Sequence, residues 1–301
     1  MAQFNTYDPR NENTLVSING ALFKRTDAKI SVLDSLAQGG DGVWEGLRVY
    51  NGKIYQLTEH AQRMVNSAKA LAFTSIPTVD EIKTAVFECL KANKMSDGVH
   101  IRLTLSRGLK ETSGMNPHLN TFGPTLIVLP EYKGLVYGDD GISLITSSIR
   151  RNPPQCLDSK IHHNNLLNNI LAKIEANASG VDDAVMLDVN GLVSETNATN
   201  IFFVKNRKVI TPFATSCLPG LTRDKVMSLC KENEIECIEK DISISEMYIS
   251  EECFTTGTMG ALAWVRQIDG RTIGDGVIGK TTQKINDLYK ISTKLEAEQI
   301  V

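Results

Sequence analysis

Short β-rich runs separated by tight-turn dipeptides recur along the chain. In a hairpin, Asn-Gly or Asp-Gly occupies the two turn positions that need a positive φ. The flanking runs alternate apolar and polar residues, as half-buried strands do. The sequence therefore predicts β-hairpins at four places: Asn19-Gly20, Asn51-Gly52, Asn190-Gly191 and Asp269-Gly270.

Other segments repeat their apolar residues with the period of an amphipathic helix. The clearest begins at a capping box, Thr78 and Glu81, ahead of apolar residues between Ile82 and Leu90 that share one face. A second apolar helix is expected over Leu166–Ile174, ending near Gly180. Further helices are expected over 64–71, from about Thr222, and after the second box, Ser243-x-x-Glu246.

Mixed hairpins and helices favour an α+β fold over a doubly wound parallel sheet. The polar, turn-rich stretch 130–141 (PEYKGLVYGDDG) predicts a linker between two domains. We therefore expect a smaller N-terminal domain over 1–129 and a larger C-terminal domain over 142–301. No internal repeat or low-complexity segment is visible.

Composition excludes several classes of protein. The chain has 301 residues and a formal net charge of −3, which argues against a nucleic-acid partner. The longest unbroken apolar stretch, Leu126–Leu129, is far too short for a membrane span, and the first residues lack the features of a secretory signal. The six cysteines form no C-x-x-C pair, and no histidine motif indicates a metal. We expect a cytoplasmic protein with small buried thiols and no metal.

One nucleotide-binding pattern is present. Gly274–Thr281 satisfies G-x-x-x-x-G-K-[ST], the pattern of a phosphate-binding P-loop. Only 20 residues follow Thr281, too few for the strands that complete such a fold and supply its Mg²⁺-binding Asp. A Gly-rich turn before a terminal helix is the favoured interpretation, and nucleotide binding remains a remote alternative.

A polar strand face is expected over 100–107. Alternation places Ile101, Leu103 and Leu105 on one face and His100, Arg102, Thr104 and Ser106 on the other. The pattern alone favours a half-solvated face. The functional alternative is a wall of donors for an anionic ligand, to which a planar arginine is suited.

Two further segments carry candidate chemistry. Leu218-Pro-Gly220-Leu-Thr222-Arg223 opens a helix whose N–H groups can bind a phosphate, with Gly220 allowing close approach and Thr222 able to cap the helix. A capped helix without a ligand explains these residues equally well. Lys160 precedes the apolar helix, and a lysine desolvated at the edge of a buried element suits imine chemistry. A solvated surface lysine is the common alternative.

Together these segments resemble the class IV aminotransferases, the fold-type IV pyridoxal-phosphate enzymes with a D-amino-acid aminotransferase-like, two-domain fold. The match runs from Glu195 through Asn200-Ile-Phe202 and Val209-x-Thr211 to Leu218-x-Gly220-Leu-x-Arg223. It extends over nearly the whole chain and is closest to the branched-chain amino-acid aminotransferases. Departures are Asn197, where a small residue is usual, and His100 and Asn165, where tyrosines are usual.

The resemblance implies pyridoxal 5′-phosphate as cofactor. Lys160 would be the Schiff-base lysine and general base, and Glu195 would keep the pyridine nitrogen protonated. Arg63 would bind the phosphate. The remaining cofactor-binding positions that it implies are Asn200, Gly220, Leu221, Thr222 and Thr258.

The resemblance also implies a ping-pong transaminase that alternates a branched-chain or other hydrophobic L-amino acid with 2-oxoglutarate. The implied substrate-binding residues are Trp44, Arg48, His100, Arg102 and Met259. The partners would be a small-molecule amino acid and a 2-oxo acid, and the assembly a homodimer or higher homo-oligomer. A D-amino-acid or amine transaminase, or an aminodeoxychorismate lyase, is the alternative within the family.

Overall fold

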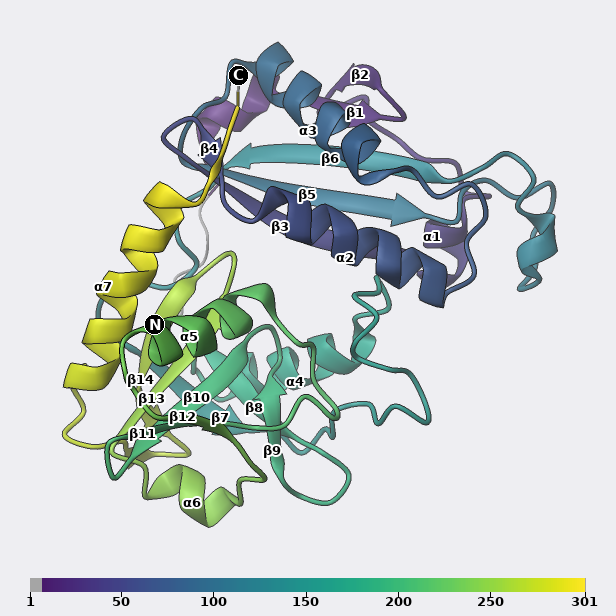
Figure 1. Cartoon of the computed structure of the whole chain (residues 1–301). Helices are drawn as coiled ribbons and strands as arrows, with labels where there is room; N and C mark the ends of the chain where they lie inside the picture. Colours follow the sequence, from purple (N-terminus) through teal and green to yellow (C-terminus); the bar gives the residue numbers. More distant parts are fainter. Residues whose placement is uncertain (1–6, 301) are drawn as a thin grey trace. The chain divides into compact units, whose positions relative to one another are not determined.

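The computed structural model describes residues 7–300, which divide into two compact units (Figure 1). The N-terminal unit comprises the described residues 7–134 together with 161–165 and 293–300. The C-terminal unit comprises 135–160 and 166–292. Each has its own mixture of sheet and helix, so the predicted α+β class is confirmed.

The N-terminal unit is an antiparallel sheet in the order β16-β4-β3-β5-β6-β1-β2, with α2 and α3 packed against it (Figure 1). One face of β3 and β5 is apolar and forms the core with the two helices, as the alternation of Ile101, Leu103 and Leu105 predicts. The elements are η1 (Pro9–Asn13), β1 (Leu15–Ile18), β2 (Ala21–Lys24), α1 (Ser35–Gly39), β3 (Gly42–Tyr50), β4 (Lys53–Ile54), α2 (Leu57–Ala70), α3 (Val79–Asn93), β5 (Val99–Ser106), η2 (Pro117–Leu119), β6 (Thr125–Tyr132) and β16 (Glu298–Gln299).

The C-terminal unit is a mixed sheet in the order β12-β11-β10-β13-β14-β7-β8-β9, with β15 paired to β14. The pairs β11–β12, β14–β7 and β7–β8 are parallel, and the others are antiparallel. The elements are β7 (Ile142–Thr146), α4 (Leu167–Ala178), β8 (Asp183–Leu187), β9 (Val193–Thr196), β10 (Asn200–Lys205), β11 (Lys208–Thr211), α5 (Leu221–Glu232), β12 (Cys237–Glu239), α6 (Ile244–Tyr248), β13 (Glu252–Gly257), β14 (Ala261–Ile268), β15 (Arg271–Thr272) and α7 (Lys280–Leu295), whose last residues, 293–295, are grouped with the N-terminal unit.

The predicted hairpins and capping boxes are confirmed. Three of the turn dipeptides join directly paired strand ends and have a positive φ at both residues, as two-residue hairpin turns require. Asn190-Gly191 lies in the slightly longer connection of β8 to β9. Both capping boxes are formed, at the starts of α3 and α6.

The helix α4 differs from the prediction in its packing. Its predicted apolar face is exposed in the single chain: Leu167, Ile170, Leu171 and Ile174 are between 48% and 65% exposed. The helix contacts the core through Ala172 and Ala176 instead. Apolar periodicity identified the helix correctly but placed the wrong stripe in the core of this chain.

The stretch 130–141 is only partly a connection. Strand β6 continues through Pro130 to Tyr132, because Val99–Ile101 of β5 pairs with it over that length. Pro130 is tolerated since β1 pairs with β6 only at Val128 and Ile127, so its missing N–H breaks no ladder on that side. Residues 161–165 and 293–300, which the sequence placed in the C-terminal domain, are grouped with the N-terminal unit.

Candidate active site

A buried carboxylate lies near the end of β9 in the C-terminal unit. Arg151 Nε donates to Glu195 Oε1 at 2.7 Å, and Asn200 Nδ2 donates to Glu195 Oε2 at 3.3 Å. Burial raises the pKa of Glu195; Arg151 and a backbone hydrogen bond from Leu218 counter the shift only in part. The group is therefore a desolvated carboxylate with a cation on one oxygen alone.

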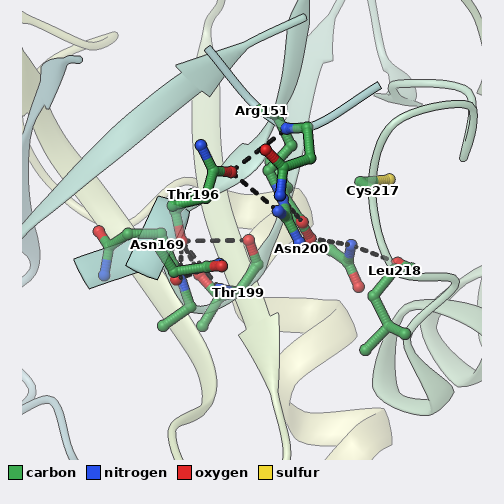
Figure 2. A network of polar contacts seen from close by, with 12 residues as sticks. Arg151, Asn169, Thr196, Thr199, Asn200, Cys217 and Leu218 are labelled. Atoms are coloured by element: carbon green, nitrogen blue, oxygen red, sulfur yellow. Dashed lines mark hydrogen bonds and ion pairs between the residues drawn. The ribbon is translucent and has the colours of Figure 1, made fainter. Parts of the chain in front are cut away.

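The turn between β9 and β10 fixes Glu195 relative to Asn200. Thr196 N–H donates to Thr199 O at 2.8 Å, and the two hydroxyls of Thr196 and Thr199 lie 2.7 Å apart (Figure 2). Asn197, the residue that departs from the resembled pattern, supports the same region: its Oδ1 accepts from Ala184 N–H at 2.7 Å. The larger side chain thus has a structural role here.

Asn200 joins Glu195 to the start of α5. Its Nδ2 also donates to Leu218 O at 2.8 Å, just before the helix (Figure 2). Gly220 is the N-cap of α5, and a Cβ at this position would lie 2.2 Å from Asn200 Oδ1. Glycine is therefore required for this close approach, whatever its effect on a ligand.

The first turn of α5 has free capacity for an anion. Thr222 was predicted as a possible cap, which is wrong: the N-cap is Gly220, and no side chain caps the helix. Thr222 is buried and Leu221 is the first helical residue. Uncapped N–H groups at a helix N-terminus attract negative charge.

A second turn follows the strand next to Asn200. Asn200 of β10 pairs with Thr256 of β13, whose buried Oγ1 has no partner among the described residues. Thr258 and Met259 follow in the turn to β14 and are half-buried. Adjacent strands thus place this turn near the end of β10 that carries Asn200.

Lys160 does not lie at a buried edge. Its side chain is exposed in the single chain, and its backbone N–H donates to Asp158 Oδ1 at 3.0 Å. The expected desolvation by the apolar helix is absent because the apolar stripe of α4 faces outward. Its amine is accessible to a ligand.

The predicted phosphate-binding arginine belongs to a cluster in the N-terminal unit. Arg63 of α2 donates to both oxygens of Glu45 from Nε and Nη2, each at 2.7 Å. Nδ1 of His60 lies 2.7 Å from Glu45 Oε2, and Nδ1 of His162 lies 3.2 Å from Oε1. Burial opposes the charge, but His162 and Arg63 outweigh it and hold the pKa of Glu45 well below its usual range.

Of the predicted substrate residues, Met259 lies in the turn before β14 of the C-terminal unit, and the other four lie on β3 and β5, on the opposite face of the sheet from Glu45. Register pairs Arg48 with His100 and places Arg102 opposite Gly46, while the Arg102 guanidinium lies 3.5 Å from the centroid of the Trp44 ring. His100 and Arg48 are buried. The half-solvated interpretation of this face is therefore wrong.

Several nitrogens on this face lack partners within residues 7–300. They are Trp44 Nε1, Arg48 Nε and both ring nitrogens of His100, all buried. Burial, with Lys133, Arg48 and Arg102 nearby, lowers the pKa of His100 to about 3, so its ring is neutral. Buried donors without partners are costly. This face is thus suited to an oxygen-rich, anionic ligand.

Sequence reasoning missed three polar residues. Arg151 gave no signal, because an arginine in an irregular segment has many possible partners. Glu45 did give one: it interrupts the apolar series Val43, Leu47 and Val49 on the core face of β3, where an unpaired charge would be costly. His162 was not predicted as a site residue.

The P-loop pattern is filled by a side chain of the protein itself. Glu252 accepts from the N–H groups of Thr281 at 3.1 Å and Thr282 at 2.7 Å, at the start of α7. A Cβ at Gly279 would lie 2.0 Å from Glu252 Cδ. An internal carboxylate therefore occupies the helix amides that a nucleotide phosphate would need, and Gly279 makes room for it.

Two other expectations concern thiols and membranes. All six cysteines are free, and Cys156 is exposed, contrary to the expectation of uniformly buried thiols. Across the described part of the chain, every helix is too short or too polar to span a bilayer. Residues 7–300 also contain no group of three or more His, Cys, Asp or Glu side chains placed to hold a metal.

Comparison with known proteins finds close relatives. The chain is 55% identical over 283 residues to the branched-chain-amino-acid aminotransferase-like protein 2 of Arabidopsis thaliana, covering 94% of this chain and 51% of that one. It thus spans about half the length of this relative and of the like protein 1 from the same plant. It is 32% identical over 290 residues to the branched-chain-amino-acid aminotransferase of Pseudomonas aeruginosa, covering 93% of both chains.

The fold has solved counterparts. The branched-chain amino acid aminotransferase of T.th., complexed with N-(5′-phosphopyridoxyl)-L-glutamate, superposes with a TM-score of 0.89 at 30% identity, covering 96% of this chain and 99% of that one. The two-domain aminotransferase fold is thereby confirmed. The family model "Amino-transferase class IV" matches residues 42–268. With the Glu195 site, the Arg63 cluster and these matches in agreement, the chain belongs to the class IV aminotransferases.

Proposed function

We propose that this chain is a pyridoxal-phosphate-dependent transaminase acting on a branched-chain or other hydrophobic L-amino acid and 2-oxoglutarate. The observation that carries the proposal is the double hydrogen bond of Asn200. Its Nδ2 contacts both Glu195 Oε2 and Leu218 O. One residue thereby ties an acceptor for a protonated ring nitrogen to a helix start suited to a phosphate.

The residues present fit the cofactor. Glu195 offers a buried carboxylate oxygen that accepts from one side chain among residues 7–300, the neutral amide of Asn200 at 3.3 Å, so it can also accept from a pyridinium N–H. Leu221 and Thr222 offer the uncapped start of α5, and Thr258 lies in the turn after the strand beside Asn200. Arg63, whose orientation Glu45 fixes through two hydrogen bonds, would add a cation for the phosphate.

The chemistry divides between two side chains and the cofactor. When bound, pyridoxal phosphate supplies an electron sink for charge developing at the substrate's α-carbon. Lys160 Nζ would hold the cofactor covalently, and as a free amine it would accept the α-proton of the substrate. Glu195 accepts the ring N–H and keeps that nitrogen protonated, and Asn200 and Arg151 hold Glu195 in place.

The proposed substrates follow from the polar face of β3 and β5. Arg48 and Arg102 provide two fixed cations for carboxylates, and Trp44 provides an aromatic wall. A 2-oxo dicarboxylate has the two anionic groups that this arrangement can bind. The names of the relatives support a branched-chain amino donor. Because the amino group would stay with the enzyme after the first product leaves, we expect ping-pong kinetics.

An amine-donor panel tests the proposal. Purified protein with added pyridoxal phosphate and 2-oxoglutarate should form glutamate from L-leucine and L-valine. Faster turnover of D-alanine, or pyruvate release from aminodeoxychorismate, would assign the chain to another activity of the family. Initial rates at varied concentrations of both substrates should give parallel lines, and intersecting lines would contradict the ping-pong order.

The covalent lysine has its own test. Borohydride reduction of the loaded protein, followed by peptide mass mapping, should place the cofactor's mass on Lys160. Lys160→Ala should abolish both the label and transamination. Lys280→Ala, which removes an exposed lysine from the P-loop pattern, is the matched control and should change neither. ATP should leave the melting temperature of both proteins unchanged.

The proposed assembly is a homodimer or higher homo-oligomer in the cytoplasm. The exposed apolar stripe Leu167, Ile170, Leu171 and Ile174 supports burial against another copy, since such patches are uncommon on monomers. Light scattering should give at least twice the 33.1 kDa of one chain, and Ile170→Glu should lower that mass. The free cysteines support a reducing compartment.

A further inference from the structure

His162 lies between residues predicted to serve two different ligands. Its ring centroid is 4.2 Å from that of Trp44, with the planes tilted by 36°. Its Nδ1 is 3.2 Å from Glu45 Oε1. Its backbone is also fixed, since its N–H donates to Ser67 Oγ at 3.1 Å and its O accepts from Trp44 N–H at 2.9 Å. Both the position and the orientation of the imidazole are therefore set.

The contact of His162 with Glu45 connects it to Arg63, the predicted phosphate-binding arginine. Glu45 is fully buried and grips Arg63 through both oxygens, so the orientation of the guanidinium follows that of the carboxylate. Arg63 Nη2 also lies 3.5 Å from His162 Nδ1. A change in the hydrogen bond to Glu45 Oε1 should therefore alter the orientation of the Arg63 guanidinium, the group that would contact the phosphate.

The contact of His162 with Trp44 connects it to the polar face of β3 and β5, where the substrate is predicted to bind. Trp44 contacts both the imidazole and the guanidinium of Arg102, which is 3.5 Å from the indole centroid. The indole Nε1–H is buried and lacks a partner within residues 7–300. A flat ring packed against Trp44 limits the rotation of the indole, and through it that of the arginine in contact with the indole.

The imidazole is neutral in this setting. Burial lowers the pKa of His162 to about 4, although Glu45 favours its charge. An ionised carboxylate only accepts hydrogen bonds, so the tautomer with the proton on Nδ1 is the one that suits Glu45. His162 thus donates one hydrogen bond and adds no further charge next to Arg63.

We propose that His162 is a positioning residue for both ligands, orienting Arg63 through its Nδ1–H bond to Glu45 and orienting Arg102 through its ring contact with Trp44. The proposal rests on the proposed function, because it takes Arg63 as a phosphate contact and Arg102 as a substrate contact. It adds a residue two positions after Lys160 that acts through others rather than on the reacting atoms.

Two substitutions separate the two contacts. His162→Phe keeps a ring against Trp44 and removes the donor to Glu45. We expect its dissociation constant for pyridoxal phosphate to rise about tenfold, the scale of one hydrogen bond to a charged group. The KM for L-leucine at saturating cofactor should change by less than about threefold.

His162→Asn keeps an N–H near the Nδ1 position and removes the ring. It should raise the KM for L-leucine and for 2-oxoglutarate by about two- to tenfold, the scale of an aromatic pair. Its dissociation constant for pyridoxal phosphate, measured by absorbance titration of the cofactor-free protein, should stay within about threefold of wild type. His162→Leu removes both contacts and should weaken both constants, which provides a second test if the Phe variant does not fold.

The controls are His118→Phe and His118→Asn, at an exposed histidine of the same unit, and neither should alter either constant. If His162 has a purely structural role, all of its variants should lower the melting temperature. They should then either change the pyridoxal phosphate dissociation constant and the KM for L-leucine in parallel, or leave both unchanged. Either result overturns the proposal. If wild-type protein itself fails to bind pyridoxal phosphate, the proposed function fails with it, whereas normal wild-type binding with parallel variants overturns only the role of His162.

Discussion

Two buried glutamates, one in each unit, are both paired with arginine, yet their pKa values shift in opposite directions. Glu45 has cationic N–H donors on both oxygens, at 2.7 Å, and an imidazole on each. Glu195 has Arg151 on one oxygen at 2.7 Å and the neutral side-chain amide of Asn200 on the other at 3.3 Å, with a backbone hydrogen bond from Leu218 besides. The pKa falls well below its usual range in Glu45 and rises in Glu195, where burial prevails.

The difference shows how one residue type serves two purposes. A carboxylate whose two oxygens already accept hydrogen bonds from fixed donors has a structural role, which is to orient those donors. A buried carboxylate with only a long hydrogen bond on one oxygen is less stable in its charged form. A cationic donor that binds this oxygen therefore stabilises the charge strongly. Glu45 therefore behaves as a support, and Glu195 as a binding group.

The sharpest test of the support role is Glu45→Gln. Breaking a buried ion pair from one side costs about 3–5 kcal/mol, because Arg63 and two imidazole donors lose their anion. The free energy of unfolding should fall by that amount, measured by urea denaturation in a Trp264→Phe background, where Trp44 reports on the N-terminal unit. Glu59→Gln, at an exposed position of α2, should change it by less than about 0.5 kcal/mol. A loss below about 1 kcal/mol would contradict the assignment.

Glu195→Gln tests whether Glu195 is a binding group, with transaminase activity as the measurement. The amide cannot hold a ring nitrogen protonated, so kcat/KM for L-leucine should fall by about 100-fold or more, the scale of one preorganised electrostatic contact. Stability should change less than in Glu45→Gln, since glutamine still accepts from Arg151 and removes a charge that burial disfavours. Glu232→Gln at the exposed end of α5 is the control. Activity within threefold of wild type would argue that Glu195 is a structural anion as well.

Acid should destabilise the protein through its buried neutral histidines. The pKa of His100 is lowered to about 3 and that of His162 to about 4, against an ordinary 6.5. The unfolded chain therefore binds more protons below pH 6.5, so stability is complete above that pH and is lost on acidification towards the folded-state values. By pH 5.5 each residue should cost about 1.4 kcal/mol. In unfolding measured between pH 7.5 and 5.5, His100→Gln should remove its share of the slope; an unchanged slope would contradict the neutral, buried ring.

The local elements were largely predictable, as was the position of Glu195 near the end of a strand and close to Asn200, because each depends on nearby residues. Asn19-Gly20 determines its turn through backbone torsions, and Thr78 with Glu81 determines a helix start through two hydrogen bonds. Glu195 and Asn200 are five residues apart, joined by one short turn. Such features need no knowledge of distant parts of the chain.

What could not be predicted depends on pairings between distant residues. Arg151 and Glu195 form an ion pair although they are 44 residues apart in sequence, and His162 contacts Glu45 from an even more distant part of the sequence. The apolar stripe of α4 was expected in the core, because periodicity shows that a face will be buried but not against which surface. The P-loop pattern was a coincidence of spacing, since Glu252, far away in sequence, fills its helix start.

A smaller perturbation of the Glu195 group comes from Gly220→Ala. The added Cβ would lie 2.2 Å from Asn200 Oδ1, although the backbone φ of −69° suits alanine. Asn200 must therefore move, which weakens its bonds to Glu195 and Leu218 and costs about 1 kcal/mol, or roughly five- to tenfold in cofactor affinity. Gly39→Ala, where nothing lies within 4 Å of the new Cβ, should leave that affinity unchanged. An equal loss of cofactor affinity in Gly220→Ala and Gly39→Ala would show that Asn200 does not link Glu195 to the start of α5.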